Sequence, residues 1–232
     1  LYLQLLLMKD IYYWLLILII GLIMFSCGEK GKDENHDKTD QNDAKMASKS
    51  HEIVDCNYTF EEAVAGSDAP QKIINELVLL DVRYFSTDNK IHKGQILTNK
   101  KIAADIVELF EFMISNHFPV YQAIPIVHFD WDDNKSMAAN NSSSFCYRNV
   151  ANIYRKSKHS TGMAIDINPY FNPIRYKSPQ QNKSNIPKGS VLDTTVAGTL
   201  YPEHPVVKEF KRRGFRWGHH FRKYFDDHHF DK

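Results

Sequence analysis

Hydrophobic positions along the chain follow two spacings, one typical of strands and one typical of helices. Residues 77–85 are apolar and partly β-branched, and polar turn residues follow them, which predicts a strand. Asn99 then precedes a segment with three- and four-residue apolar spacing, which predicts an amphipathic helix capped by Asn99 and packed on a sheet. The predicted apolar face of this helix consists of Ile102, Ile106, Leu109, Phe110, Met113 and His117.

Three further segments complete the predicted elements. Residues 124–129 and 163–168 have the composition of strands. Residues 205–213 predict a short helix, with Pro205 in its first turn and Gly214 after its end. Strands and helices follow one another without a regular βαβ alternation. We therefore predict a compact α+β domain with a small, mainly antiparallel sheet packed against helices and a site in a surface cleft.

The N-terminal segment has a different hydropathy from the rest of the chain. Lys9 precedes an apolar run at residues 15–25, and Ser26 and Cys27 follow it, as in an export signal. Counted from Ile11, the run is only marginally long enough to cross a bilayer, which needs about 20 residues. Residues 1–27 are thus either a cleaved signal or a retained membrane anchor.

The ending Ser26-Cys27-Gly28 resembles a bacterial lipoprotein signal, although Phe25 departs from the stricter pattern. That resemblance implies that Cys27 is lipidated. Both interpretations place the domain in the cell envelope, tethered to a membrane and facing the periplasm or the exterior. Residues 28–52 are almost devoid of apolar side chains and predict a flexible linker, so the folded domain is expected at residues 53–232.

Overall composition excludes one class of partner. The chain has 29 Lys and Arg against 28 Asp and Glu, which leaves no basic field for nucleic acid. Cys56 and Cys146 would be able to form one disulfide in an exported protein, but sequence does not show that they meet. We expect a monomer.

Three residues carry the candidate chemistry: His159, Asp166 and His229. Two imidazoles and one carboxylate leave a tetrahedral Zn²⁺ with one open position, the ligand count of a catalytic site. Strand alternation turns Asp166 away from the core, and Gly162 permits a backbone turn that brings His159 toward it. The alternative, that His159 is an ordinary loop residue and Asp166 an ordinary surface residue, stays open at this point.

The C-terminal stretch strengthens the metal interpretation. Residues 214–230 contain four His, two adjacent carboxylates, Trp217 and four Phe, a density that suits a metal site with supporting side chains. The alternative is that His219, His220 and His228 lie on the surface, which we expect of at least one of them.

Together these motifs resemble the zinc D-alanyl-D-alanine carboxypeptidases of the VanY and VanX type and the related L-alanyl-D-glutamate endopeptidases. The matching motifs are Ser157-x-His159-x-x-Gly162-x-Ala164-x-Asp166, Gly214-Phe215-x-Trp217-Gly218, Asp226-x-x-His229-Phe230, Ser136-Met137-x-x-Asn140-Asn141 and Phe145-x-Tyr147-Arg148. They extend over most of the region from residue 77 to the end.

The resemblance implies one Zn²⁺ per chain, held by His159, Asp166 and His229. It also implies that Asp226 is the general base and that Arg148 stabilises the oxyanion, although Arg148 in a structural ion pair is the alternative. Ser157 and Trp217 are expected to support the ligands or to contact substrate.

The implied substrate is the peptide stem of peptidoglycan, cut at a D-alanyl-D-alanine or an L-alanyl-D-glutamate bond. Carboxypeptidase members commonly have Glu where this chain has Asp227, whereas Asp226 fits the endopeptidases. Two other functions stay open: a catalytically inactive zinc-containing lipoprotein that binds the cell wall, and a weaker alternative, a metal scavenger.

Overall fold

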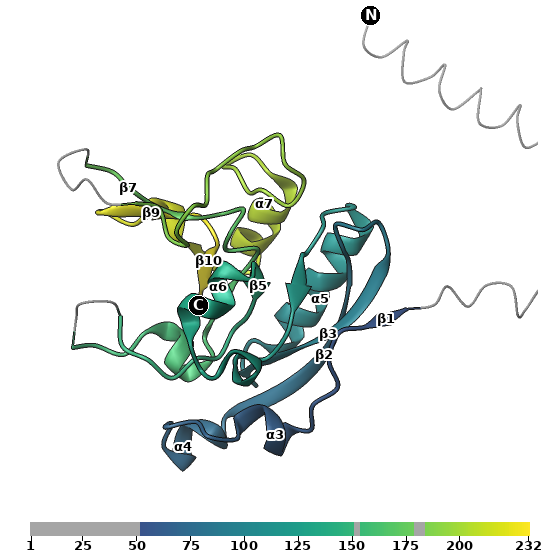
Figure 1. Cartoon of the computed structure of the whole chain (residues 1–232), viewed down its shortest axis with the longest axis vertical. Coiled ribbons are helices and arrows are strands. Elements are labelled where there is room, and N and C mark those ends of the chain that lie inside the picture. Colours follow the sequence, from purple (N-terminus) through teal and green to yellow (C-terminus); the bar gives the residue numbers. More distant parts are fainter. Residues whose placement is uncertain (1–51, 151–153, 179–183) are drawn as a thin grey trace, which may run out of the picture. The chain divides into compact units, whose positions relative to one another are not determined.

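A long antiparallel hairpin, β2 (Leu77–Phe85) and β3 (Ile91–Asn99), is the frame of the folded part of the chain (Figure 1). The computed structural model describes residues 52–150, 154–178 and 184–232. A short strand, β1 (Ile53–Val54), pairs in parallel with β3, so the strand order is β1-β3-β2. The strand predicted at residues 77–85 is therefore confirmed with its boundaries.

The remaining elements are short and lie on both sides of this hairpin. In chain order they are α3 (Phe60–Val64), α4 (Gln71–Ile74), α5 (Ala103–Ser115), β4 (Gln122–Ala123), η1 (Ile126–Phe129), α6 (Asp133–Ala138), β5 (Asn141–Ser142), η2 (Lys158–Thr161), β6 (Ala164–Asp166), β7 (Ile174–Tyr176), α7 (Pro205–Arg212), β8 (Arg216–Trp217), η4 (Gly218–His220), β9 (Tyr224–Asp226) and β10 (His229–Asp231). The predicted mixed α+β class with small, mostly antiparallel sheets is confirmed.

Helix α5 supplies the main core. Its buried face consists of Ile106, Leu109, Phe110 and Met113, as predicted, and it packs against Val82 of β2 in one hydrophobic cluster. The prediction is wrong for His117, which lies beyond the end of the helix and is exposed. The predicted cap is wrong in detail, because the residue at the cap position is Ile102, which makes no side-chain cap. The Asn99 side chain accepts a hydrogen bond from the Lys101 backbone instead, which closes the turn before the helix.

A second hydrophobic cluster lies on the other face of the hairpin. Strand alternation turns Leu77 and Leu97 away from α5, and they pack with Ala63 of α3 and with Phe145. The hairpin is thus covered on both faces.

The strand predicted at residues 124–129 is wrong. The chain forms the two-residue strand β4 at Gln122–Ala123 and then a 3₁₀ helix, η1, that starts after Pro125. Proline lacks the N–H that a strand ladder requires and sets φ for a turn, so the apolar run that follows it coils instead of extending. The run still buries Ile126 in the interior.

A small three-stranded sheet near the C-terminus, with strand order β6-β10-β8, carries the candidate site. Helix α7 lies between β6 and β8 in the chain and begins at Pro205, and Gly214 takes a positive φ after the helix, both as predicted. Strands β7 and β9 form a separate antiparallel pair beside this sheet. The strand predicted at residues 163–168 is present but shorter, as β6.

The structure tests only part of what the sequence predicts for the N-terminal segment and the cysteines. The predicted export segment, Cys27 and nearly all of the linker lie outside the described residues. Within the described ranges, no helix has the length and apolar character that crossing a bilayer would require. Cys56 and Cys146 are both free thiols in the structure.

Candidate metal centre

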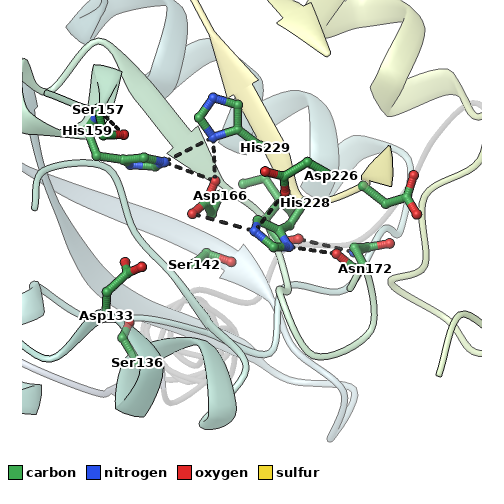
Figure 2. Close-up of polar contacts among 12 residues, drawn as sticks. Asp133, Ser136, Ser142, Ser157, His159, Asp166, Asn172, Asp226, His228 and His229 are labelled. Atoms are coloured by element: carbon green, nitrogen blue, oxygen red, sulfur yellow. Dashed lines mark hydrogen bonds and ion pairs between the residues drawn. The ribbon is translucent and has the colours of Figure 1, made fainter. Parts of the chain in front are cut away.

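Strand pairing brings two of the three candidate ligands together. In the antiparallel ladder of β6 and β10, Asp166 lies directly opposite His229, so their side chains leave the sheet on the same face. His159 reaches the same point from η2, as Figure 2 shows. All three side chains are buried, which rules out the alternative of ordinary loop and surface residues.

The ligand atoms form a nearly equilateral triangle. His159 Nε2 lies 3.0 Å from His229 Nδ1 and 3.2 Å from Asp166 Oδ1, and His229 Nδ1 lies 3.1 Å from Asp166 Oδ1. A tetrahedral zinc with bonds of about 2.0 Å requires ligand atoms about 3.3 Å apart. The donor set and its spacing therefore fit one face of a zinc tetrahedron, with the fourth corner left for water or substrate.

Hydrogen bonds around His159 fix the ring for this role. His159 Nδ1 lies 2.6 Å from the Ser144 carbonyl oxygen, which only accepts, so Nδ1 carries the proton and Nε2 presents its lone pair to the ion. Ser157 caps η2, and its Oγ accepts a hydrogen bond from the His159 backbone N–H at 3.3 Å. The geometry thus fits the supporting role expected of Ser157.

The turn between His159 and Asp166 depends on glycine, as predicted. Gly162 has φ of +66°, and a Cβ there would lie 2.7 Å from the Asn99 nitrogen and 2.9 Å from Leu77 Cδ2. Any larger residue would combine a strained backbone with a clash against β2 and β3. The glycine therefore sets the position of His159 relative to β6.

His229 is held from its far side by a second carboxylate. Its Nε2 faces Asp231 Oδ2 at 3.6 Å, and Arg216 binds both oxygens of Asp231 at 2.8 and 2.6 Å. A carboxylate behind a metal-bound imidazole orients the ring and raises its basicity. Asp231 was not predicted as a site residue, although its position two residues after His229 on one strand was a usable signal.

The electrostatics of the site favour a cation. Burial works to raise the pKa of Asp166, but the surrounding His159 and His228 hold the pKa of this carboxyl well below its usual value. Burial works to lower the pKa of His229, yet the carboxylates of Asp166 and Asp231 raise it to about 10. A field that retains a proton on a buried imidazole is also one that attracts a divalent ion, and the ion would displace that proton.

Two adjacent carboxylates at the end of β9 have different surroundings. Asp227 is buried in an ion pair with Arg175 at 2.8 Å and lies 2.6 Å from His219 Nδ1. Asp226 faces the metal centre, and its Oδ1 lies 3.0 Å from His228 Nε2 (Figure 2). This approach lacks hydrogen-bond alignment, so Asp226 Oδ1 is a buried acceptor with no aligned donor among the described residues.

The sequence did not predict the buried position of His228. It is fully buried, and it links Asp226 to Asp166, whose Oδ2 lies 3.9 Å from its Nε2. Burial works to lower the pKa of His228, but these two carboxylates raise it to about 9. The expectation that at least one of the three histidines lies on the surface is confirmed by His220, which is exposed, whereas His219 is partly buried and His228 is buried.

The structure contains the ion pair that the sequence left open for Arg148, whereas its role toward an oxyanion stays a prediction. Its Nε lies 2.9 Å from Asp133 Oδ2, which is an ion pair. The charge of Asp166 also acts on Arg148, so the guanidinium lies within electrostatic range of the metal centre. Asp133 was not predicted as part of the site.

Trp217 has a packing role in the structure. It is fully buried, stacks on His219 and Phe230, and donates a hydrogen bond from Nε1 to the Asp227 carbonyl at 2.9 Å. The adjacent Gly218 lies tight against the site, because a Cβ there would lie 2.8 Å from Asp226 Cβ and 3.2 Å from His229 Cβ. The Trp-Gly pair thus supports the site from behind.

Comparison with known proteins finds a family match for the C-terminal part of the chain. Residues 151–232 match the family model described as D-alanyl-D-alanine carboxypeptidase, and this range includes His159, Asp166, Asp226 and His229. No curated protein and no solved structure matches the chain. The C-terminal part of the chain, residues 151–232, is therefore similar to the D-alanyl-D-alanine carboxypeptidase family.

Proposed function

We propose that this protein is a zinc-dependent peptidase that hydrolyses the peptide stem of bacterial peptidoglycan. The observation that carries the proposal is the triangle of buried ligand atoms, 3.0 to 3.2 Å apart, on His159, Asp166 and His229. It lies inside the part of the chain that matches a peptidase family. No expected ligand or base is missing, which argues against an inactive wall-binding protein.

Bound zinc would supply Lewis acidity, polarising the substrate carbonyl and lowering the pKa of a water molecule to about 7. Asp226, beside the ligands, would take the proton from that water as it attacks the peptide carbonyl carbon. It would then deliver the proton to the leaving amine, so that one carboxylate serves both steps. Asp227 is unsuited to this role because Arg175 and His219 occupy its oxygens.

Arg148 would donate hydrogen bonds to the tetrahedral oxyanion. Its ion pair with Asp133, 2.9 Å from Nε, would hold the guanidinium in place for this role. Preorganised donors of this kind are worth on the order of 100- to 1000-fold in rate. In this proposal the ion pair aims the arginine, so the two interpretations of Arg148 are compatible.

Two bonds of the stem are candidates, each supported by a separate observation. The family description favours the D-alanyl-D-alanine bond. The base three positions before His229, with Asp227 engaged elsewhere, favours the L-alanyl-D-glutamate bond, as in the endopeptidases that the sequence resembles. The products of digestion separate the two: free D-alanine in the first case, and a peptide with a new N-terminal D-glutamate in the second.

Digestion of purified muropeptides tests the proposal. The full chain with one equivalent of zinc should cut pentapeptide stems, as followed by mass spectrometry, and Asp226→Ala should abolish cutting while zinc stays bound. A zinc-loaded chain that leaves every muropeptide intact, while a known peptidase digests the same sample, would contradict the proposal.

We also propose that the domain works in the cell envelope on a membrane tether. Support comes from the sequence pattern alone: an apolar run before Cys27 and a polar linker after it. Cys27→Ala should abolish lipid labelling of the protein and, if the anchor is the lipid, move it from the membrane to the soluble fraction. Membrane retention without lipid labelling would indicate an uncleaved helix instead.

A further inference from the structure

His228 lies in an unusual place for a buried imidazole. It belongs to the two-residue turn that connects β9 and β10, and turns of this kind are normally exposed and rich in small polar residues. Only 2% of its surface is exposed. Burying a polar ring at a turn costs free energy unless the ring has fixed partners, so the contacts of His228 require an explanation.

One edge of the ring is anchored to a rigid part of the fold. His228 Nδ1 lies 2.7 Å from the Asn172 carbonyl oxygen, and the His228 carbonyl accepts a hydrogen bond from the Ile167 backbone. Asn172 is itself fixed, because its side chain donates to the Gly198 carbonyl and accepts from the Leu200 N–H at 2.6 Å. The ring therefore has little freedom to rotate.

The opposite edge of the ring faces the proposed base. His228 Nε2 lies 3.0 Å from Asp226 Oδ1 and 3.9 Å from Asp166 Oδ2. Among the described residues, no lysine or arginine pairs with Asp226, whereas neighbouring carboxylates do have arginine partners: Asp133, Asp227 and Asp231 pair with Arg148, Arg175 and Arg216. His228, with its Nε2 3.0 Å from Asp226 Oδ1, is thus the side chain that the structure offers to orient Asp226.

We propose that His228 is a positioning residue that holds the Asp226 carboxylate in place for proton transfer. The Asn172 carbonyl sets the ring, the ring sets Asp226 through Oδ1, and Oδ2 of Asp226 stays available to the attacking water. The inference rests on the proposed function, since it assigns His228 a role in that same reaction. It requires no contact between His228 and the ion or the substrate.

Two amide substitutions separate positioning from simple structural support. In His228→Gln the amide nitrogen takes the place of Nε2 and keeps the contact with Asp226. In His228→Asn the amide nitrogen takes the place of Nδ1 and keeps only the contact with the Asn172 carbonyl. His220→Gln and His220→Asn, at an exposed position eight residues earlier, are the matched controls.

The test measures kcat and KM on muropeptides, zinc affinity by chelator competition, and the melting temperature for all four variants. We expect His228→Asn to lose about 10- to 100-fold in kcat, the usual cost of removing a supporting partner. KM and zinc affinity should change less than threefold, and His228→Gln should recover at least a third of the lost activity on a logarithmic scale. The His220 variants should match the unchanged protein.

Four results would contradict the inference. The first is a kcat for His228→Asn that equals or exceeds the kcat for His228→Gln, because that order would mean that only the contact with the Asn172 carbonyl matters. A kcat loss that merely follows loss of zinc or of folded protein would assign His228 a structural role. Normal turnover by both His228 variants would remove any role, whereas no turnover by the unchanged protein would contradict the proposed function and the inference together.

Discussion

The two halves of the domain bury different kinds of side chain. Around the β2–β3 hairpin and α5 the interior consists of apolar residues such as Val82, Ile96 and Phe110. Around β6, β9 and β10 it contains a concentration of buried ionisable groups: His159, Asp166, Asp226, Asp227, His228, His229 and Asp231. One hydrophobic cluster connects the two halves, because Ile165 of β6 and Phe230 of β10 belong to the same cluster as Val82 and Phe110.

Apolar burial lowers the free energy of the folded state at about 25 cal/mol per Å², whereas burial of a charge raises it unless a partner compensates. A cluster of seven buried ionisable groups is therefore poorly explained by stability alone. Its arrangement around one triangle of ligand atoms explains it as a functional site. We therefore expect substitutions around the hairpin to reduce mainly stability, and substitutions around the ligand atoms to reduce mainly activity.

The largest expected effect comes from Asp226→Asn. Loss of the general base should reduce kcat by about 100- to 10000-fold, with zinc affinity and melting temperature nearly unchanged. Asp227→Asn is the matched control, since it leaves Arg175 without its charge partner and should cost about 2–4 kcal/mol of stability. Steady-state kinetics and thermal melting check the pair, and a larger kcat loss in Asp227→Asn would reverse the assignment of the base.

In the apolar half, Phe110→Ala should show the opposite pattern. Phe110 is fully buried on α5, with its ring 6.3 Å from that of Tyr84. Its truncation should cost about 3–5 kcal/mol of unfolding free energy, measured by urea denaturation. The kcat of the protein that remains folded should stay within twofold, and a much larger fall would mean that the two halves are not separable.

A smaller effect on both properties is expected at Gly218. The methyl group of Gly218→Ala would lie 2.8 Å from Asp226 Cβ and 3.2 Å from His229 Cβ, so the base and a ligand must shift together. We expect zinc affinity and kcat each to fall about 10- to 100-fold. Chelator competition and kinetics measure this, and unchanged zinc affinity would show that the sheet absorbs the methyl group elsewhere.

The smallest effect concerns an ion-pair network at the end of α7, which Arg213 extends to Glu108 of α5. Glu209 of α7 accepts hydrogen bonds from Arg212 and Arg213, which lower its pKa to about 2. Its stabilisation is therefore fully present above about pH 4.5 and is lost as the pH falls through about 2. Glu209→Gln should lower stability by about 1 kcal/mol at pH 7, because Arg212 is largely exposed.

The pH dependence distinguishes this network from general destabilisation. The difference between Glu209→Gln and the unchanged protein should shrink steadily below pH 4.5 in thermal melts. Glu203→Gln, at an exposed pair with Lys208, should leave the melting temperature nearly unchanged at both pH values. A Glu209→Gln deficit that persists unchanged at pH 2 would show that packing, and not charge, is responsible.

Local patterns predicted the elements whose causes are local. The strand at residues 77–85, the buried face of α5 and the helix beginning at Pro205 follow from alternation, spacing and turn residues. The strand predicted at residues 124–129 failed because Pro125 breaks a ladder that the apolar run alone suggested.

In the site, the convergence of His159, Asp166 and His229 was predictable from the motifs. The burial of His228 was not, because it depends on the carbonyl of Asn172, which is 56 residues away in the chain. The pairing of Asp133 with Arg148 was missed for the same reason, since no periodicity connects α6 with the segment after β5. Contacts between distant segments decide these positions.

Anomalous diffraction at the zinc edge, on crystals of the zinc-loaded protein, tests the central claim most directly. The account predicts one peak per chain, about 2.0–2.2 Å from His159 Nε2, His229 Nδ1 and a carboxylate oxygen of Asp166. A peak at His219 and His220, or a zinc-loaded crystal without a peak among these three side chains, would contradict it.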